Sequence, residues 1–211
     1  MKLYFVRHGE SEANVLQVIS NRGWVHPLTE KGRQQANTLA EKLRGAGITK
    51  IFTSPLRRAA ETAEILSQSL GVGIEITDAL REFDCGIAEG RSDPEAWRMH
   101  RELWNDWIVQ LGWESRIEGG ESFLDMQRRF VPWLERILRE EQNNLESLVL
   151  IGHGALYYSM LPVVLFNISR QSIAGLDFPN TGYVLAENGL QGLVCLEWCG
   201  AKVSAAKFTD A

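Results

Sequence analysis

The sequence predicts a three-layer α/β sandwich, in which a largely parallel central sheet is flanked by helices. Two observations predict this fold class. Short apolar runs alternate along the chain with longer segments whose apolar residues recur at helical spacing. Two of these runs also end in histidine followed by glycine, at His8 and His153, and open α/β sheets build their sites at such strand ends.

The predicted strands are short apolar runs bounded by glycine, proline or polar residues. The first, over residues 2–6, is followed at once by Arg7, His8 and Gly9. Its continuous apolar character is typical of a strand buried on both faces of a parallel sheet. The other predicted strands cover residues 48–53, 74–77, 148–151, 183–186 and 193–198.

The predicted helices carry apolar stripes and termination signals. Thr29 is the predicted N-cap of the first helix, which Gly45 ends. A second helix starts at Ser54–Pro55, because proline is well tolerated near a helix start. Further helices follow residues 119–122 and cover residues 155–166, and Pro132 is predicted to kink or interrupt the former.

A tryptophan-rich segment over residues 93–111 differs from the rest. One helical face carries Trp97, Trp104, Ile108 and Leu111, with Trp107 on its flank. We interpret this face as a packing surface that can also form one wall of a pocket. The segment belongs to a predicted helical insert, at about residues 91–118, within a single domain over residues 1–211.

Composition limits the classes of partner. The net charge of −5 argues against a nucleic-acid-binding protein. No apolar run reaches a membrane span and no signal peptide is visible, so we expect a cytoplasmic protein without membrane partners. The sequence is compatible with a homodimer but does not specify the oligomeric state. The stretch after Gly200 is predicted to be disordered.

The three cysteines, Cys85, Cys195 and Cys199, form no cluster of the kind that binds metal. Free thiols in a reducing compartment are the simplest interpretation.

The strand ends carry a cluster of basic residues. If the strands are parallel, His8, His153 and the arginines at 7, 57 and 58 gather at one edge of the sheet. Such a cluster repels itself unless an anion belongs there, and the planar donor fork of arginine suits phosphate. The alternative without a functional role is a charged loop with surface histidines.

This cluster has the groups that phosphoryl transfer needs. A neutral histidine can attack phosphorus if an acceptor, such as a backbone carbonyl, holds its other ring nitrogen. Fixed donors must balance the charge on the phosphoryl oxygens, and the leaving oxygen needs a proton. For the proton donor we choose Glu82, with Asp84 and Glu89 as weaker candidates.

The chain resembles the histidine phosphatase superfamily, the phosphoglycerate-mutase-like group. The resemblance is carried by RHGESEAN at residues 7–14, LTEKG at 28–32, SPLRRAAETA at 54–63 and GHG at 152–154. These motifs are specific, lie in the family's order and span about residues 2–166.

The resemblance implies a role for each matched residue. His8 would be the phosphorylated nucleophile and Glu82 the proton donor. The phosphate pocket would be formed by Arg7, Arg57 and His153, and the substrate would be contacted by Asn14, Ser11 and Gly154. We expect Arg58 at the surface or outside the pocket lining, and His26 and His100 to be ordinary loop or surface residues. The family uses no metal for this step, and we expect no cofactor.

Two reactions of the family fit these residues. Mutases of the family usually carry a Tyr-Gly-x-Leu-Gln-Gly-like stretch after the acid, whereas residues 83–90 here read FDCGIAEG. The short insert and the Gly119–Gly120–Glu121–Ser122 stretch resemble the phosphatase branch. We therefore favour a metal-independent phosphatase acting on small phosphate monoesters, with a phosphoglycerate mutase as the alternative.

Other classes remain open at this point. A non-catalytic phospho-ligand binder is weakened because every catalytic residue type is present. A metallohydrolase using His8, His153 and a carboxylate is disfavoured, because the nearby arginines would repel a metal cation.

The sequence leaves the substrate undecided. Four arginines of the insert could bind a second anionic group, and the tryptophans of the insert could admit a bulkier, partly apolar ester. These arginines are Arg91, Arg98, Arg101 and Arg116.

Overall fold

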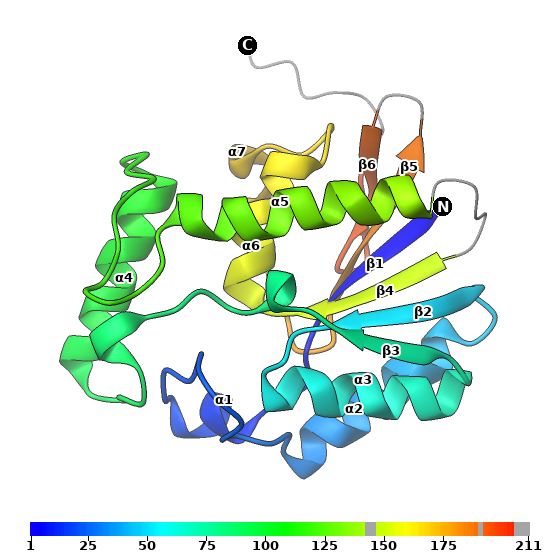
Figure 1. The fold of residues 1–211 in the computed structure, drawn as a ribbon, viewed down its shortest axis with the longest axis horizontal. Helices are drawn as coiled ribbons and strands as arrows, with labels where there is room; N and C mark the ends of the chain where they lie inside the picture. The colour runs from blue at the N-terminus through cyan, green and yellow to red at the C-terminus, as the bar shows by residue number, and fades with distance from the viewer. Residues whose placement is uncertain (142–146, 190–191, 205–211) are drawn as a thin grey trace.

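The computed structural model describes residues 1–141, 147–189 and 192–204. Over these residues the chain forms one seven-stranded sheet, in the order β3-β2-β4-β1-β5-β6-β7 (Figure 1). The strands are β1 (Lys2–Arg7), β2 (Ile48–Thr53), β3 (Gly73–Ile76), β4 (Ser147–Gly152), β5 (Tyr183–Gly189), β6 (Gly192–Trp198) and β7 (Ala201–Lys202).

The central part of the sheet is parallel. The strands β3, β2, β4 and β1 all run in the same direction, and β5, β6 and β7 close the sheet in antiparallel fashion. The register pairs Arg7 with Gly152 and Thr53 with Ile151, so the carboxyl ends of β1, β2 and β4 are level. The predicted fold class, a largely parallel sheet flanked by helices, is confirmed.

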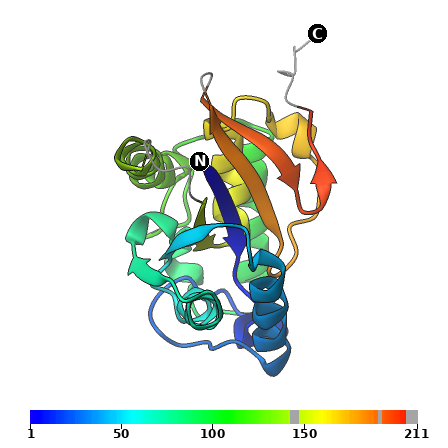
Figure 2. The same ribbon diagram turned by 90° about the vertical axis from the view of Figure 1, so that its right-hand side faces the viewer.

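Helices cover both faces of the sheet, as Figure 2 shows. Alternate residues of β1 belong to different cores: Leu3 and Phe5 pack on the side of α5 and α6, whereas Tyr4 and Val6 pack on the side of α2 and α3. This follows from the period-two alternation of side chains along a strand. The α-helices are α1 (Glu12–Leu16), α2 (Glu30–Leu43), α3 (Arg57–Leu70), α4 (Pro94–Ile108), α5 (Phe123–Glu140), α6 (Gly154–Val164) and α7 (Arg170–Ile173), with short 3-10 turns η1 (Asp78–Leu80) and η2 (Gly86–Ala88).

Polar side chains define the helix starts. Thr29 accepts a hydrogen bond from the Gly32 amide, as predicted for an N-cap, and Ser122 forms a capping box with Asp125 at the start of α5. Of the two effects predicted for Pro132, a kink or an interruption, the interruption is wrong, because α5 continues through it to Glu140. Packing of six α5 side chains into the core outweighs the lost backbone hydrogen bond; these are Phe123, Met126, Phe130, Trp133, Leu134 and Ile137.

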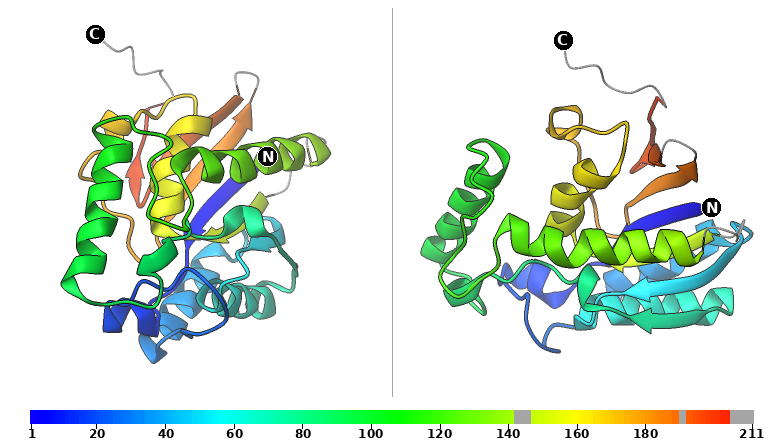
Figure 3. Two further views of the ribbon diagram at one scale, coloured as in Figure 1. Left: turned by 60° about the vertical axis from the view of Figure 1, so that its left-hand side comes forward. Right: turned by 45° about the horizontal axis from the view of Figure 1, so that its top comes forward.

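The tryptophan-rich helix α4 stands apart from the sheet, beside the start of α5 (Figure 3). Its predicted face is partly wrong. Trp107, expected on the flank, is fully buried and donates from Nε1 to the Ser115 carbonyl oxygen. Leu111 lies beyond the end of the helix and is 56% exposed. The prediction applied helical spacing to Leu111, which is not in the helix. The packing face of α4 therefore includes Trp107 and excludes Leu111.

The C-terminal region differs in part from the prediction of disorder after Gly200. The prediction is wrong for Ala201–Lys202, which form β7 against β6, and residues 205–211 lie outside the described part of the chain.

The three cysteines are free thiols, as predicted. Among the described helices, none has both the length and the apolar character required to cross a membrane.

Candidate active site

The carboxyl ends of three parallel strands bring the predicted site residues together. His8 follows β1, His153 follows β4 and Ser54 follows β2, all at one edge of the sheet. The His8 and His153 rings lie with their centroids 5.1 Å apart. His153 Nε2 is 2.8 Å from the Ser54 hydroxyl, so the three strand ends are directly linked. The gathering expected from a parallel sheet is confirmed.

His8 is held in one orientation by both ring nitrogens. Its Nδ1 lies 2.6 Å from the carbonyl oxygen of Gly9, and its Nε2 lies 3.0 Å from Arg58 Nε. Because arginine can only donate, Nε2 is the acceptor and the proton sits on Nδ1. The backbone carbonyl thus fixes the tautomer, as predicted. Burial, together with the Arg58 and Arg7 guanidinium groups, lowers the pKa of His8 well below its usual range, which keeps the ring neutral.

Arg58, rather than Arg57, is the arginine of α3 that reaches the site. Arg58 is only 6% exposed, and besides His8 it donates to the Ser20 carbonyl oxygen and to Asn21 Oδ1. Arg57 points elsewhere and pairs with Glu61 at 2.8 Å. The prediction that Arg57 forms the pocket and Arg58 does not is therefore wrong. Neighbouring helical residues point about 100° apart, and the way α3 packs on the sheet decides which one faces inward.

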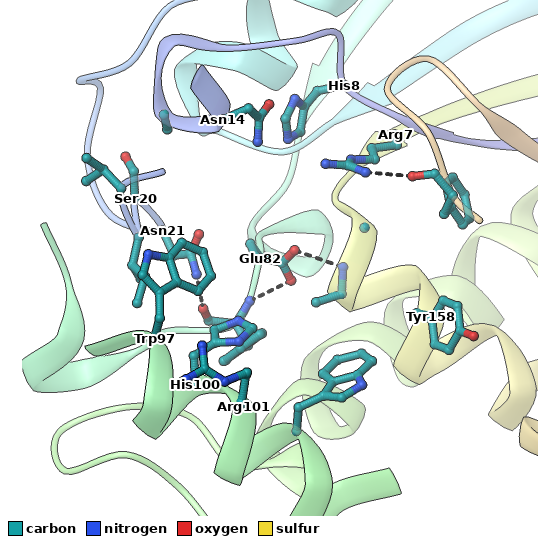
Figure 4. A pocket seen from close by; sticks show the side chains of 18 of the residues that line it. Arg7, His8, Asn14, Ser20, Asn21, Glu82, Trp97, His100, Arg101 and Tyr158 are labelled. Atoms are coloured by element: carbon teal, nitrogen blue, oxygen red, sulfur yellow. Dashed lines mark hydrogen bonds between the residues drawn. The ribbon is translucent and has the colours of Figure 1, made fainter. Parts of the chain in front are cut away.

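Arg7 contributes a second guanidinium group. Its Nη1 donates to the Phe178 carbonyl oxygen at 2.6 Å, which anchors the side chain beside Gly154 at the start of α6 (Figure 4). Burial lowers the pKa of Arg7, and the nearby Glu82 carboxylate opposes that shift. We call Arg7, His8 and Arg58 the basic end of the site.

Two buried nitrogens at this edge have no hydrogen-bond partner within the described residues. They are Arg7 Nε and His153 Nδ1. His153 is fully buried and does not line the cavity itself, and its pKa is lowered well below the usual range by burial and by Arg58. Unpaired buried polar atoms are costly, and an anion at the basic end would supply acceptors there.

Asn14 lines the cavity beside His8, whereas Ser11 does not (Figure 4). Ser11 is fully buried, and both its amide and its hydroxyl donate to Asn14 Oδ1. With its oxygen occupied, Asn14 presents its amide nitrogen as a donor. The expectation that Ser11 contacts the substrate is wrong, because Ser11 instead orients Asn14.

Glu82 lies across the cavity from His8, close to the start of α6 (Figure 4). Its Oε1 accepts from the Phe83 and Leu156 amides, and its Oε2 accepts from the Ala155 amide at 3.0 Å. Burial raises the pKa of Glu82, although the Phe83 and Ala155 amides and Arg58 oppose the shift. A raised pKa makes a carboxyl group better able to hold a proton that it can pass to a leaving group.

The other two carboxylates considered as acids serve the surrounding loops. Asp84 forms an ion pair with Arg22 at 2.7 Å and accepts from the Gly86 amide. Glu89 accepts from the amides of Asn21 and Arg22. Neither lines the cavity, so of the three carboxylates predicted as acids only Glu82 is brought to the site.

A close backbone contact sets the position of the His8 turn. A Cβ atom added at Gly9 would lie 2.5 Å from the Gly32 carbonyl oxygen, and one added at Gly32 would lie 2.0 Å from the Glu10 carbonyl oxygen. No side chain fits at either position. The first turn of α2 therefore packs directly on the backbone that carries the histidine.

The opposite side of the cavity is aromatic. The cavity has a volume of about 790 Å³, and Figure 4 shows Trp97, His100 and Tyr158 away from the basic end. Together with Trp104 these residues form what we call the aromatic wall. His100, expected to be an ordinary loop or surface residue, in fact lines the cavity, whereas His26 does not. Burial lowers the pKa of His100, with the Arg101 charge acting in the same direction.

Sequence reasoning missed several lining residues. Ser20 and Asn21 meet Arg58 from the loop after α1, and Asp177 and Phe178 come from the segment before β5. None of them stands in a motif, so only the three-dimensional structure reveals them. Among the described residues, no three His, Cys, Asp or Glu side chains are grouped closely enough to hold a metal ion.

Three comparisons relate this chain to known proteins. The family model described as "Histidine phosphatase superfamily (branch 1)" matches residues 3–199. The probable phosphoglycerate mutase GpmB of Salmonella paratyphi B is 36% identical over 154 residues, which are 73% of this chain and 70% of that protein. GpmB of Proteus mirabilis is 30% identical over 193 residues, covering 87% and 88%. The structure of a mycobacterial glucosyl-3-phosphoglycerate phosphatase with VO3 superposes with a TM-score of 0.77 at 23% identity, covering 95% and 99%.

Proposed function

This chain belongs to the histidine phosphatase superfamily, and on that premise we propose that it hydrolyses phosphate monoesters through a phosphohistidine at His8. One observation carries the proposal. The neutral His8 ring lines a cavity with its Nε2 accepting from the Arg58 guanidinium, beside Arg7 and across from the buried Glu82 carboxyl. A nucleophile, charge-balancing donors and an acid thus surround one volume.

In the first step, His8 Nε2 attacks phosphorus. A new N–P bond forms and the P–O bond to the leaving group breaks, while Glu82 gives its proton to the departing oxygen. The ring becomes positively charged, and its Nδ1 proton stays bound to the Gly9 carbonyl oxygen. Arg58 must exchange its bond with Nε2 for bonds to phosphoryl oxygens, which leaves the guanidinium next to the developing charge.

In the second step, water replaces the histidine. The ionised Glu82 takes a proton from the water, whose oxygen attacks phosphorus as the N–P bond breaks. Phosphate leaves, and both His8 and Glu82 return to their starting protonation states. Arg7 and the Asn14 amide remain in contact with the same phosphoryl group throughout.

A second candidate is a phosphoglycerate mutase, which the names of the GpmB relatives favour. A mutase would return the phosphoryl group of His8 to another oxygen of the substrate instead of to water. The stretch at residues 83–90 lacks the mutase-like sequence, and this difference favours the phosphatase.

The two candidates are separated by a product assay. Purified protein, treated with a strong chelator, is incubated with nitrophenyl phosphate, sugar phosphates, nucleotides and phosphoglycerates, and both free phosphate and isomerised ester are measured. Release of phosphate from one or a few esters supports the phosphatase. Isomerised phosphoglycerate without matching phosphate release would instead establish the mutase, and loss of all activity with the chelator would contradict the metal-independent mechanism.

A further inference from the structure

The cavity extends well beyond the basic end. Its volume of about 790 Å³ is in the range that encloses a drug-sized ligand, and a phosphoryl group fills only a small part of it. The remaining space lies along α4 and the start of α6, where the aromatic wall is. The leaving group of the substrate must occupy this space, so the chemistry of the wall bears on what that group is.

Two polar groups of the wall are held by hydrogen bonds within the protein. Trp97 donates from Nε1 to the Gln17 carbonyl oxygen at 2.8 Å, and the Tyr158 hydroxyl donates to the Ile173 carbonyl oxygen. Both polar groups are therefore occupied by the protein itself. Trp104 packs against Tyr158 with ring centroids 5.9 Å apart, and His100 packs against Trp97 at 5.3 Å. The rings are fixed in place before any ligand arrives.

Few arginines of the insert are available to a second anionic group. Three of the four are used in ion pairs: Arg91 with Asp93, Arg98 with Glu95 and Glu102, and Arg116 with Asp125. Arg101 is the fourth and lines the cavity, where it is one cation among several aromatic rings. The rings therefore make up more of this side of the cavity than the charges do.

We propose, on the premise of the phosphatase activity above, that the substrate is the phosphate monoester of an alcohol bearing an aromatic or heteroaromatic ring system. The phosphoryl group lies at the basic end and the ring packs on Trp97 and Trp104 of α4. Trp104 is then a residue that determines specificity without touching the reacting atoms. This assignment also disfavours phosphoglycerate, which is small and has no ring to pack on the wall.

The test compares three esters of primary alcohols, so that cleavage of the P–O bond is chemically alike in each. They are naphthylmethyl phosphate, ethyl phosphate and 3-phosphoglycerate. For the wild-type protein we expect kcat/KM for the naphthylmethyl ester to exceed the other two by at least tenfold. A ring–ring contact with burial of apolar area accounts for a factor of about that size.

Variants test whether the preference for the naphthylmethyl ester comes from the aromatic wall. Trp104→Ala should raise KM for the naphthylmethyl ester about tenfold and lower the preference for that ester over ethyl phosphate by a similar factor. Trp104→Phe, which keeps a ring, should restore most of the difference. Trp24→Ala is the matched control, because Trp24 is 54% exposed and does not line the cavity. The circular dichroism spectrum of each variant reports on its folding independently of activity.

The outcomes separate the inference from the proposed function. Equal kcat/KM for the naphthylmethyl and ethyl esters, or an equal loss for all three in Trp104→Ala, would overturn the inference and leave the phosphatase intact. Preference for 3-phosphoglycerate would also overturn it. If no ester releases phosphate, the proposed function fails, and the inference that rests on it fails as well.

Discussion

The basic end and the aromatic wall face the same cavity but are built in opposite ways. The basic end comes from the end of β1 and the first turn of α3, is largely buried, and each of its side chains is fixed by hydrogen bonds to neighbouring backbone or side chains. The aromatic wall comes mainly from α4, which stands apart from the sheet and is held by ring packing and by two hydrogen bonds to backbone carbonyls. Chemistry that must stay constant is located at the strand ends and on the helix that packs against them, and recognition that can vary is located in the insert.

The largest effect should come from removing the nucleophile of the basic end. His8→Ala should lower turnover about 10⁴-fold or more and abolish the acid-labile phosphoenzyme, because no other neutral imidazole lines the phosphoryl position. The phosphoenzyme is followed with a radiolabelled ester and quenching at high and low pH. His26→Ala is the matched control, since His26 does not line the cavity. Substantial turnover in His8→Ala would refute the covalent mechanism.

The next effect distinguishes two neighbouring arginines. Arg58→Ala should lower kcat/KM about 10²- to 10³-fold, as expected for losing one fixed donor to a developing oxyanion. Arg57→Ala should change it less than about threefold, because Arg57 pairs with Glu61 outside the cavity. Steady-state kinetics with one ester measure both. A larger loss in Arg57→Ala than in Arg58→Ala would support the prediction from the sequence that Arg57 forms the phosphate pocket, and would contradict the orientation of α3.

A smaller effect should depend on the leaving group. Glu82→Gln should slow hydrolysis of alkyl esters about 10²-fold, because an alkoxide needs a proton as it departs, and should barely affect nitrophenyl phosphate. The ratio of the two rates is the measurement. Asp84→Asn, which alters an ion pair outside the cavity, should leave that ratio unchanged. If both esters slow equally in Glu82→Gln, the acid is another group.

The smallest effect is on stability. His153 has a folded-state pKa well below its usual range, so protonation of the unfolded chain below about pH 6.5 favours unfolding. The stability that the neutral ring provides is complete above that pH and falls as the pH drops. Between pH 7.5 and 5.5 the loss should be about 1.4 kcal/mol smaller in His153→Gln than in the wild type. Urea unfolding at the two pH values measures this, and identical losses would contradict the buried neutral ring.

The sequence predicted the strand ends well because local rules govern them. The apolar runs before His8 and His153 are typical of buried strands, and parallel strands place their carboxyl ends together. The Gly9 carbonyl partner of His8 was likewise anticipated from the need to fix one tautomer. These inferences use only a few consecutive residues.

The errors arose where tertiary packing decides between equivalent local choices. Arg57 and Arg58 have the same chemistry, and only the packing of α3 on the sheet selects Arg58. Ser11 and Asn14 share one capping motif, yet only Asn14 faces the cavity. His100 stands in no motif, and its place in the wall depends on how α4 sits over the strand ends.

The contact between Gly9 and Gly32 makes the basic end less tolerant of substitutions than the aromatic wall. Because two backbone segments touch there with no side chain between them, no rotamer can relax to absorb an added methyl group. Gly32 is 24 residues from His8 in the chain and lines no cavity, so a mutagenesis library restricted to cavity residues would omit it. An engineer seeking a new leaving-group preference can therefore randomise the cavity-lining rings of α4, but must carry this glycine pair over unchanged.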